Sequence, residues 1–168
     1  MRFIKICAGV FALASILISV SYMLRQSGPK GTAEFVEALE DAPINSVIRL
    51  SDYISFQASE VCLLTPYQYR IPPKNSQHAS EINEKIRKVR LGSDDALWNV
   101  VLWKTGKIEV IELTRYLSSE IKSKDFGEVE HRLFSRVTFL QKPCSDFSSA
   151  AFIKFKSDDQ TFLAFGGA

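Results

Sequence analysis

The first 25 residues constrain this chain more than any other stretch. An uncharged run of 19 residues, ICAGVFALASILISVSYML, lies between Lys5 and Arg25. A helix of that length is about 28 Å long, close to the roughly 30 Å hydrocarbon thickness of a bilayer. The sequence therefore predicts an N-terminal transmembrane anchor over residues 1–25.

A cleaved signal peptide is the alternative for the same stretch. Signal peptides usually have a shorter apolar region, of roughly 7 to 15 residues, before a small-x-small cleavage site. Cleavage after Ala14 would leave too short an apolar region. Cleavage after Ser21 is compatible with the sequence, but the bulky tripeptide Tyr-Met-Leu then continues the run. An uncleaved anchor explains that continuation better, and a buried helix of a soluble protein is the third interpretation.

The charges around the run predict its orientation. Arg2, Lys5 and the terminal amine are expected to stay in the cytoplasm, with the rest of the chain translocated. Arg25 and Lys30 on the far side oppose this direction, but the short tail before the run favours it. We therefore expect a single-pass protein of the bacterial inner membrane with its main domain in the periplasm.

Composition places one globular domain after the anchor. A Gly- and Pro-containing linker, QSGPKG, occupies residues 26–31, and residues 32–168 are long enough for a single core. The hydrophobic share of 46% and the 12 Phe are typical of a folded domain. Three of the 21 basic residues belong to the anchor, which leaves 18 basic against 19 acidic residues. A near-neutral domain argues against a nucleic-acid partner.

The predicted topology determines how the three cysteines are interpreted. Cys7 lies inside the apolar run, whereas Cys62 and Cys144 lie in the translocated part. Because an exported domain meets an oxidising environment, we expect a disulfide between Cys62 and Cys144. A redox or nucleophilic thiol is the alternative, but neither a C-x-x-C motif nor a nearby His supports it.

The apolar patterning predicts an α+β domain. Thr32 is expected to cap a helix that runs to Asp41, and a second helix is expected from Ser80 to Leu91. We expect an antiparallel sheet of about five or six strands with both helices on one face. A polar stretch at 118–127 reads as a helical turn or a loop. Segments with strand-like patterns, from which this sheet would be built, lie at 46–50, 60–64, 97–103, 108–113, 131–140, 150–156 and 161–165.

One stretch resembles a known group of proteins. The sequence VCLLTPY at 61–67, followed by a Trp-rich hairpin and a late cysteine, resembles small, largely uncharacterised exported proteins of proteobacteria with a V-C-x-L-x-P-Y stretch. The resemblance extends over about residues 50–155. It implies export and a disulfide, and it carries no catalytic residue over. An anchored periplasmic domain with one disulfide is also similar in architecture to some bacteriocin immunity proteins.

Catalytic and metal-binding patterns are weak in this sequence. It contains two histidines without H-E-x-x-H spacing, and no G-x-S-x-G motif. We therefore expect no cofactor, no metal and no catalysis. An enzyme assembled from scattered residues, for example Asp52, Glu60 and His78, remains the alternative from another class.

Aromatic residues offer a candidate binding surface. Trp98 and Trp103 are five residues apart on one predicted strand, so they point to opposite faces. Both can be buried, or one can serve as an exposed interface anchor. Tyr67 and Tyr69 flank a Pro-rich loop and could form a recognition rim with Trp103, or pack as ordinary loop residues.

The function that these features favour is protein binding by a membrane-tethered periplasmic domain. An inhibitor, an immunity factor or an envelope accessory protein would each have this organisation. Besides the scattered-site enzyme, a soluble factor released by cleavage after Ser21 is the other alternative.

Overall fold

The computed structural model describes residues 28–89, 91, 97–114, 119–122, 139–157 and 159–168. The predicted anchor at residues 1–25 lies outside them. Among the helices described, none is long and apolar enough to cross a membrane. In chain order the elements are α2 (Thr32–Asp41), β1 (Ser46–Arg49), η1 (Leu50–Asp52), β2 (Glu60–Leu64), η2 (Pro73–Asn75), α3 (Ala79–Val89), β3 (Leu97–Lys104), β4 (Lys107–Thr114), β5 (Glu120–Lys122), β6 (Leu140–Gln141), β7 (Cys144–Asp146), β8 (Ala150–Ser157) and β9 (Gln160–Gly167).

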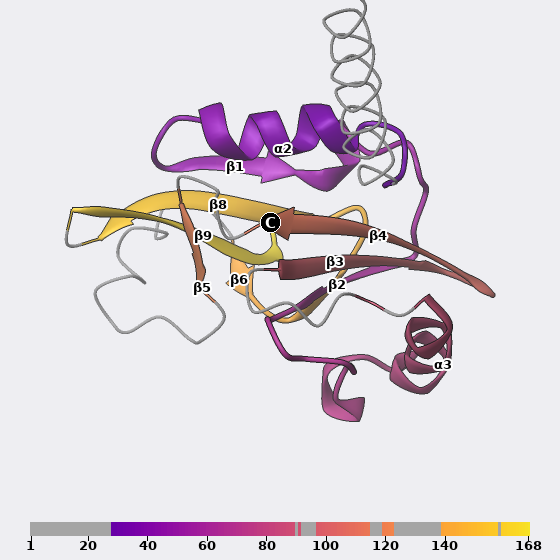
Figure 1. Ribbon diagram of the computed structural model, residues 1–168. Coiled ribbons are helices and arrows are strands. Elements are labelled where there is room, and N and C mark those ends of the chain that lie inside the picture. The colour runs from indigo at the N-terminus through magenta and orange to yellow at the C-terminus, as the bar shows by residue number, and fades with distance from the viewer. Residues whose placement is uncertain (1–27, 90, 92–96, 115–118, 123–138, 158) are drawn as a thin grey trace, which may run out of the picture.

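The strands form two sheets where the sequence predicted one (Figure 1). One sheet has the order β4-β3-β2-β7, and all of its pairs are antiparallel. The other has the order β1-β8-β9-β5, with β6 also paired to β9. The α+β class is thus confirmed, but the β5–β9 pair is parallel, and β5 falls in the stretch predicted as a helical turn or a loop.

The two hairpins and both helices lie where the sequence predicted them. β3 and β4 are joined across Thr105 and Gly106, and β8 pairs with β9 over its full length. The helices match the predicted spans to within two residues. Most of the strand predicted at 131–140 lies outside the described residues, and only its last residue belongs to β6.

The helices lie on opposite sides of the sheets, which corrects the expectation that both would cover one face. In Figure 1, α2 lies above the sheets and α3 lies below them. The reason is that β2 and β3 are apolar on both faces. Val100 and Leu102 belong to the core on the α2 side, whereas Val101 and Trp103 belong to the core on the α3 side. A strand buried on both faces needs a cover on each.

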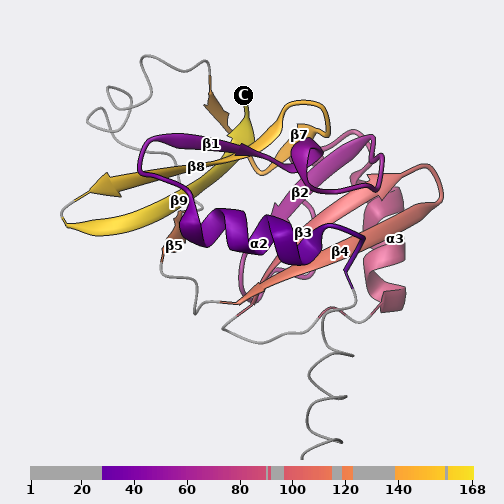
Figure 2. The same ribbon diagram turned by 90° about the horizontal axis from the view of Figure 1, so that it is seen from above.

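The larger core joins α2 to both sheets (Figure 2). Phe35 of α2 packs against Phe152 of β8, with 5.9 Å between ring centroids, and Phe152 packs against Phe165 of β9. Trp98 of β3 and Leu163 of β9 are in the same core, so this cluster holds the two sheets together.

Lys154 ties the end of α2 to this core. Its side chain is 6% exposed, and its ammonium donates a hydrogen bond to the backbone carbonyl of Glu40. The last carbonyls of a helix lack partners within the helix and form its negative end. A buried ammonium on β8 therefore finds both an acceptor and a favourable dipole there.

The start of α2 differs from the sequence prediction. Gly31, with φ 97°, occupies the N-cap position, and no side chain caps the helix. Thr32 instead donates its hydroxyl to the carbonyl of Pro29 at 2.6 Å. A glycine is required because a Cβ at position 31 would collide with the carbonyl oxygen of Tyr53.

This packing predicts unequal costs for two glycine substitutions. Gly31→Ala should lower the free energy of unfolding by about 3 kcal/mol, because it adds a steric collision to left-handed backbone strain. Gly106→Ala should cost about 1 kcal/mol, since an added Cβ there meets no atom within 4 Å and only the positive φ is unfavourable. Urea unfolding of the two variants measures both values. Equal losses would contradict the close approach of Gly31 to Tyr53.

Candidate functional site

The disulfide predicted from the sequence is present in the structure. Cys62 on β2 lies directly opposite Cys144 on β7, with the Cα atoms 4.1 Å apart and a separation of 82 positions in sequence. By chain entropy, a loop of that length gives roughly 4 to 5 kcal/mol of stabilisation. The two residues are 1% and 6% exposed. A thiol-exchange partner therefore has little access to the sulfur atoms, and the bond is structural in character.

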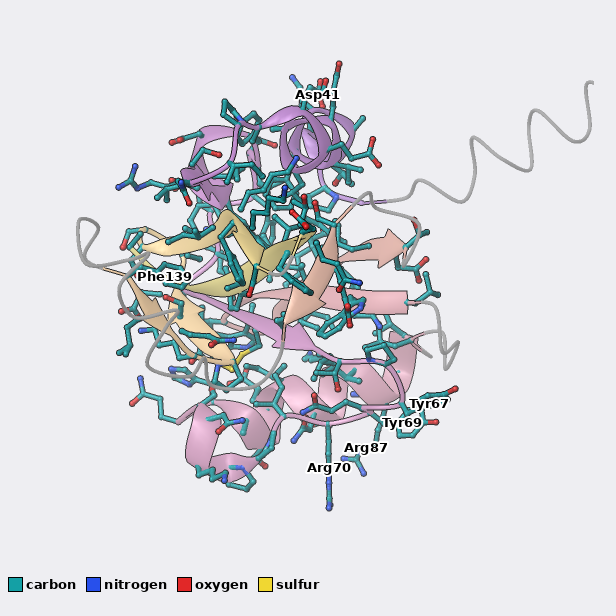
Figure 3. All side chains as sticks on the ribbon, turned by 90° about the vertical axis from the view of Figure 1, so that its left-hand side faces the viewer. Asp41, Tyr67, Tyr69, Arg70, Arg87 and Phe139 are labelled. Carbon is teal, nitrogen blue, oxygen red and sulfur yellow. A yellow bond between two sulfur atoms is a disulfide. The ribbon has the colours of Figure 1, made fainter. Side chains whose placement is uncertain are left out.

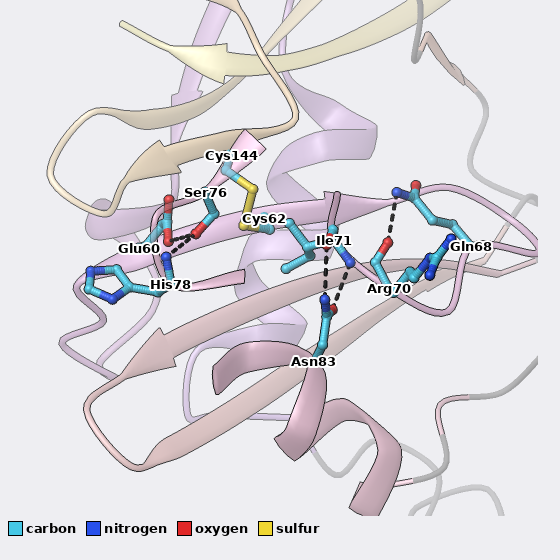
Figure 4. The surroundings of a disulfide bond; sticks show 9 residues. All are labelled: Glu60, Cys62, Gln68, Arg70, Ile71, Ser76, His78, Asn83 and Cys144. Atoms are coloured by element: carbon cyan, nitrogen blue, oxygen red, sulfur yellow. Dashed lines mark hydrogen bonds between the residues drawn. A yellow bond between two sulfur atoms is a disulfide. The ribbon is translucent and has the colours of Figure 1, made fainter. Parts of the chain in front are cut away.

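The surroundings of the disulfide bring three potential metal ligands together. A carboxylate oxygen of Glu60 and the sulfur atoms of Cys62 and Cys144 lie within 4.8 Å of one another. The sulfur atoms are bonded to each other, so the oxidised chain offers no thiolate there. One carboxylate oxygen of Glu60 instead accepts a hydrogen bond from the Ser76 hydroxyl at 2.6 Å (Figure 4).

Two of the three residues in the alternative catalytic set lie near each other. Glu60 and His78 both contact Ser76, since the backbone N–H of His78 donates to the Ser76 hydroxyl. The His78 ring, however, stacks on Trp103 with 4.0 Å between centroids. Asp52 is exposed in η1, and its carboxylate makes no hydrogen bond or ion pair with another described residue. The set does not form a nucleophile–base pair.

The loop from Thr65 to His78, which we call the β2–α3 loop, is held by side chains from within and from α3. The Gln68 amide accepts from the backbone N–H of Thr65 at 3.2 Å and donates to the carbonyl of Arg70 at 3.1 Å. Asn83 of α3 accepts from the N–H of Ile71 at 2.7 Å and donates to its carbonyl at 2.9 Å. Ile71 itself is buried in the core under α3. These contacts fix the loop backbone at both ends of its aromatic segment (Figure 4).

The fixed loop exposes two tyrosines. Tyr67 is 62% and Tyr69 is 56% exposed, while Gln68 between them reaches back into the loop. Tyr67 also has φ 63°, a backbone conformation that is uncommon for a bulky residue. The loop thus presents aromatic side chains outward from a backbone that is constrained by hydrogen bonds.

The structure does not place Trp103 in a rim with the tyrosines. Trp103 is 4% exposed and packs with Ile82 and Ile86 of α3 in the core on that side of the sheet. Both tryptophans are buried, on opposite faces of β3 as their spacing predicted. Trp103 therefore belongs to the core between β3 and α3.

Two arginines near the tyrosines were missed by the sequence reasoning. Arg70 follows Tyr69 directly, and Arg87 lies one helical turn after Asn83 on α3. The sequence does place Asn83 and Arg87 on one face of the helix, because they are four residues apart. This spacing locates Arg87 near the loop only because Asn83 contacts Ile71.

The charged residues of α3 are Glu81, Glu84, Lys85, Arg87 and Lys88, so three are basic and two are acidic. The one ion pair of this helix among described residues joins Lys88 to Glu84 at 2.7 Å. The hydrogen bond from Lys88, together with the charge of Lys88, lowers the pKa of the Glu84 carboxyl. The Glu84 carboxylate therefore stays ionised and forms its ion pair with Lys88 of the same helix.

Comparison of this chain with models of protein families, with curated proteins and with solved structures gave no match. Functional inferences therefore rest on the geometry of its own residues.

The hydrogen bonds of Asn83 predict a measurable effect on the loop. Asn83→Ala removes both bonds to Ile71, so we expect the free energy of unfolding to fall by about 2 kcal/mol. The amide of Ile71 should also exchange its hydrogen faster. The control is Asn75→Ala, in the same loop, whose side chain makes no hydrogen bond with another described residue. Unchanged exchange at Ile71 in Asn83→Ala would show that α3 does not hold the loop.

Proposed function

We propose that this protein is a membrane-tethered domain of the bacterial envelope that acts by binding another protein through the β2–α3 loop. The observation that carries the proposal is the combination of exposure and constraint at Tyr67 and Tyr69. Both side chains are more than half exposed, on a backbone held by Gln68 and Asn83.

Exposed tyrosines on a constrained loop suit protein recognition for a physical reason. Tyrosine offers a large contact area with two side-chain torsions, so little conformational entropy is lost when it is buried at an interface. A loop already held in one conformation avoids a further ordering cost on binding. Tyrosine and arginine are also enriched among the residues that contribute most binding energy.

Three features support the location that we propose. The apolar run at residues 6–24 has the length of a membrane span, and the linker that follows it would hold the domain near the bilayer. A buried disulfide is typical of proteins in an oxidising compartment such as the periplasm. The resemblance of the VCLLTPY stretch to small exported proteobacterial proteins points in the same direction.

The proposed mode of action is binding without catalysis. An inhibitor or an immunity factor acts by occupying a surface of its partner, and an envelope accessory protein acts by positioning it. Each of these needs a specific, preformed contact surface and no reactive group. The β2–α3 loop supplies such a surface next to the disulfide-bonded strands.

The proposal predicts that the tyrosines determine partner recovery. After chemical crosslinking in the envelope, the full-length protein should retain a specific partner, and Tyr67→Ala/Tyr69→Ala should reduce its recovery. If one tyrosine is a binding hot spot, worth about 2 kcal/mol, the loss of affinity is about thirtyfold, and if both are, it approaches about a thousandfold.

The matched control is Ile44→Ala/Leu140→Ala. It removes two exposed apolar side chains, 42% and 67% accessible, at sites outside the β2–α3 loop. Recovery of the partner should not change in this control. Repeated failure to recover any specific partner, or equal recovery with the tyrosine variant, would contradict the proposed function.

A further inference from the structure

Arg70 and Arg87 lie on the same side of the molecule as the two tyrosines. Asn83 hydrogen-bonds Ile71, the residue after Arg70, and Arg87 follows Asn83 by one helical turn. This connection brings the arginine of the loop and the arginine of α3 to one corner, where Figure 3 shows them with Tyr67 and Tyr69. We call these four residues the tyrosine–arginine surface.

Neither arginine of this surface forms an ion pair within the described part of the chain. Arg70 and Arg87 are both exposed. The nearest acidic residue in the sequence of α3, Glu84, is paired with Lys88, and Lys88 is the main cause of its lowered pKa, with a smaller contribution from Arg87. Lys85 on the same helix adds a further positive charge. This corner is therefore basic, although the chain after residue 25 is close to neutral overall.

We propose that the tyrosine–arginine surface binds an acidic segment, rich in Asp and Glu, of the partner protein. This inference rests on the proposed function and specifies the chemistry of the partner. A guanidinium can bind a carboxylate through two parallel hydrogen bonds, which gives both strength and orientation. Two guanidiniums next to two tyrosines thus match an acidic segment that also offers apolar contacts.

Complementary charge has a second consequence for such a contact. Opposite charges across an interface accelerate association and discourage partners of the wrong charge. Arginine and tyrosine are both enriched among the residues that contribute most energy to protein–protein contacts. A surface that bound anionic lipid would not need the planar fork of arginine, because lysine serves as well at a headgroup surface. We therefore assign the surface to a protein segment, and lipid binding becomes an outcome of the test.

The test places the photo-crosslinking residue p-benzoylphenylalanine at position 69 of the full-length protein, in its own cells, and maps the adduct by mass spectrometry. The charge-reversal variant is Arg70→Glu/Arg87→Glu. Its matched control is Arg49→Glu/Lys156→Glu, which makes the same change in net charge at exposed residues of β1 and β8. Thermal unfolding of each protein verifies that the variants are folded.

We expect the crosslinked peptide of the partner to carry a clear excess of Asp and Glu over Lys and Arg. The yield of this adduct should fall by about tenfold or more in Arg70→Glu/Arg87→Glu and stay within about twofold in the control. An adduct with a neutral or basic peptide would overturn the inference. So would an adduct that survives the reversal at Arg70 and Arg87, or one formed with lipid alone.

The outcomes separate this inference from the proposed function. If Tyr67→Ala/Tyr69→Ala abolishes partner recovery while Arg70→Glu/Arg87→Glu leaves it unchanged, the loop binds a protein but not through acidic groups. That result overturns only the present inference. If no protein adduct forms at position 69 and no partner is recovered, both are wrong.

Discussion

The disulfide between Cys62 and Cys144 fixes the strand on which the rest of the domain is arranged. It joins β2 to β7 at a pair of directly opposed residues, and β2 pairs with β3 on its other side. Because β2 is buried on both faces, it contributes to the core under α2 and to the core under α3. The bond links β7, a strand of three residues, to β2 at one end of their antiparallel pairing. The covalent link therefore stabilises the centre of the structure.

The candidate binding surface depends on the same strand. The β2–α3 loop begins where β2 ends, and its course is set by Ile71 in the core and by Asn83 on α3. The Glu60–Ser76 hydrogen bond ties the far end of the loop back to the start of β2. With both ends fixed, the residues between them have a defined path. This is why Tyr67, which is uncommon at positive φ, can be held on the outside.

Local patterns were sufficient to predict much of this fold. The apolar runs of β2 and β3, the turn at Gly106 and the amphipathic spacing of Ile82 and Ile86 are all properties of neighbouring residues. The partition into two sheets was not predictable in this way. It depends on the pairing of Ser46 with Lys154, which are more than a hundred residues apart, and no local signal specifies that pairing.

The candidate site likewise has features that the sequence predicts and features that depend on tertiary contacts. Cys62 and Cys144 could be paired by reasoning on the compartment, and the exposure of Tyr67 and Tyr69 was one of two readings of a Pro-rich loop. The burial of Trp103 depends on α3 covering that face of β3, which is a tertiary effect. The sequence likewise could not indicate that Arg87 lies beside the loop, because the Asn83–Ile71 contact brings them together.

The most direct test of the proposed tethered, oxidised domain is the intact mass of the protein isolated from its own cells. The protein is alkylated under denaturing conditions, with and without prior reduction. We predict the mass of the whole 168-residue chain, with one alkyl group, on Cys7, before reduction and with all three cysteines modified after it. Free alkylation of Cys62 and Cys144 before reduction would contradict the oxidising compartment. A mass that begins near Tyr22 would contradict the tether.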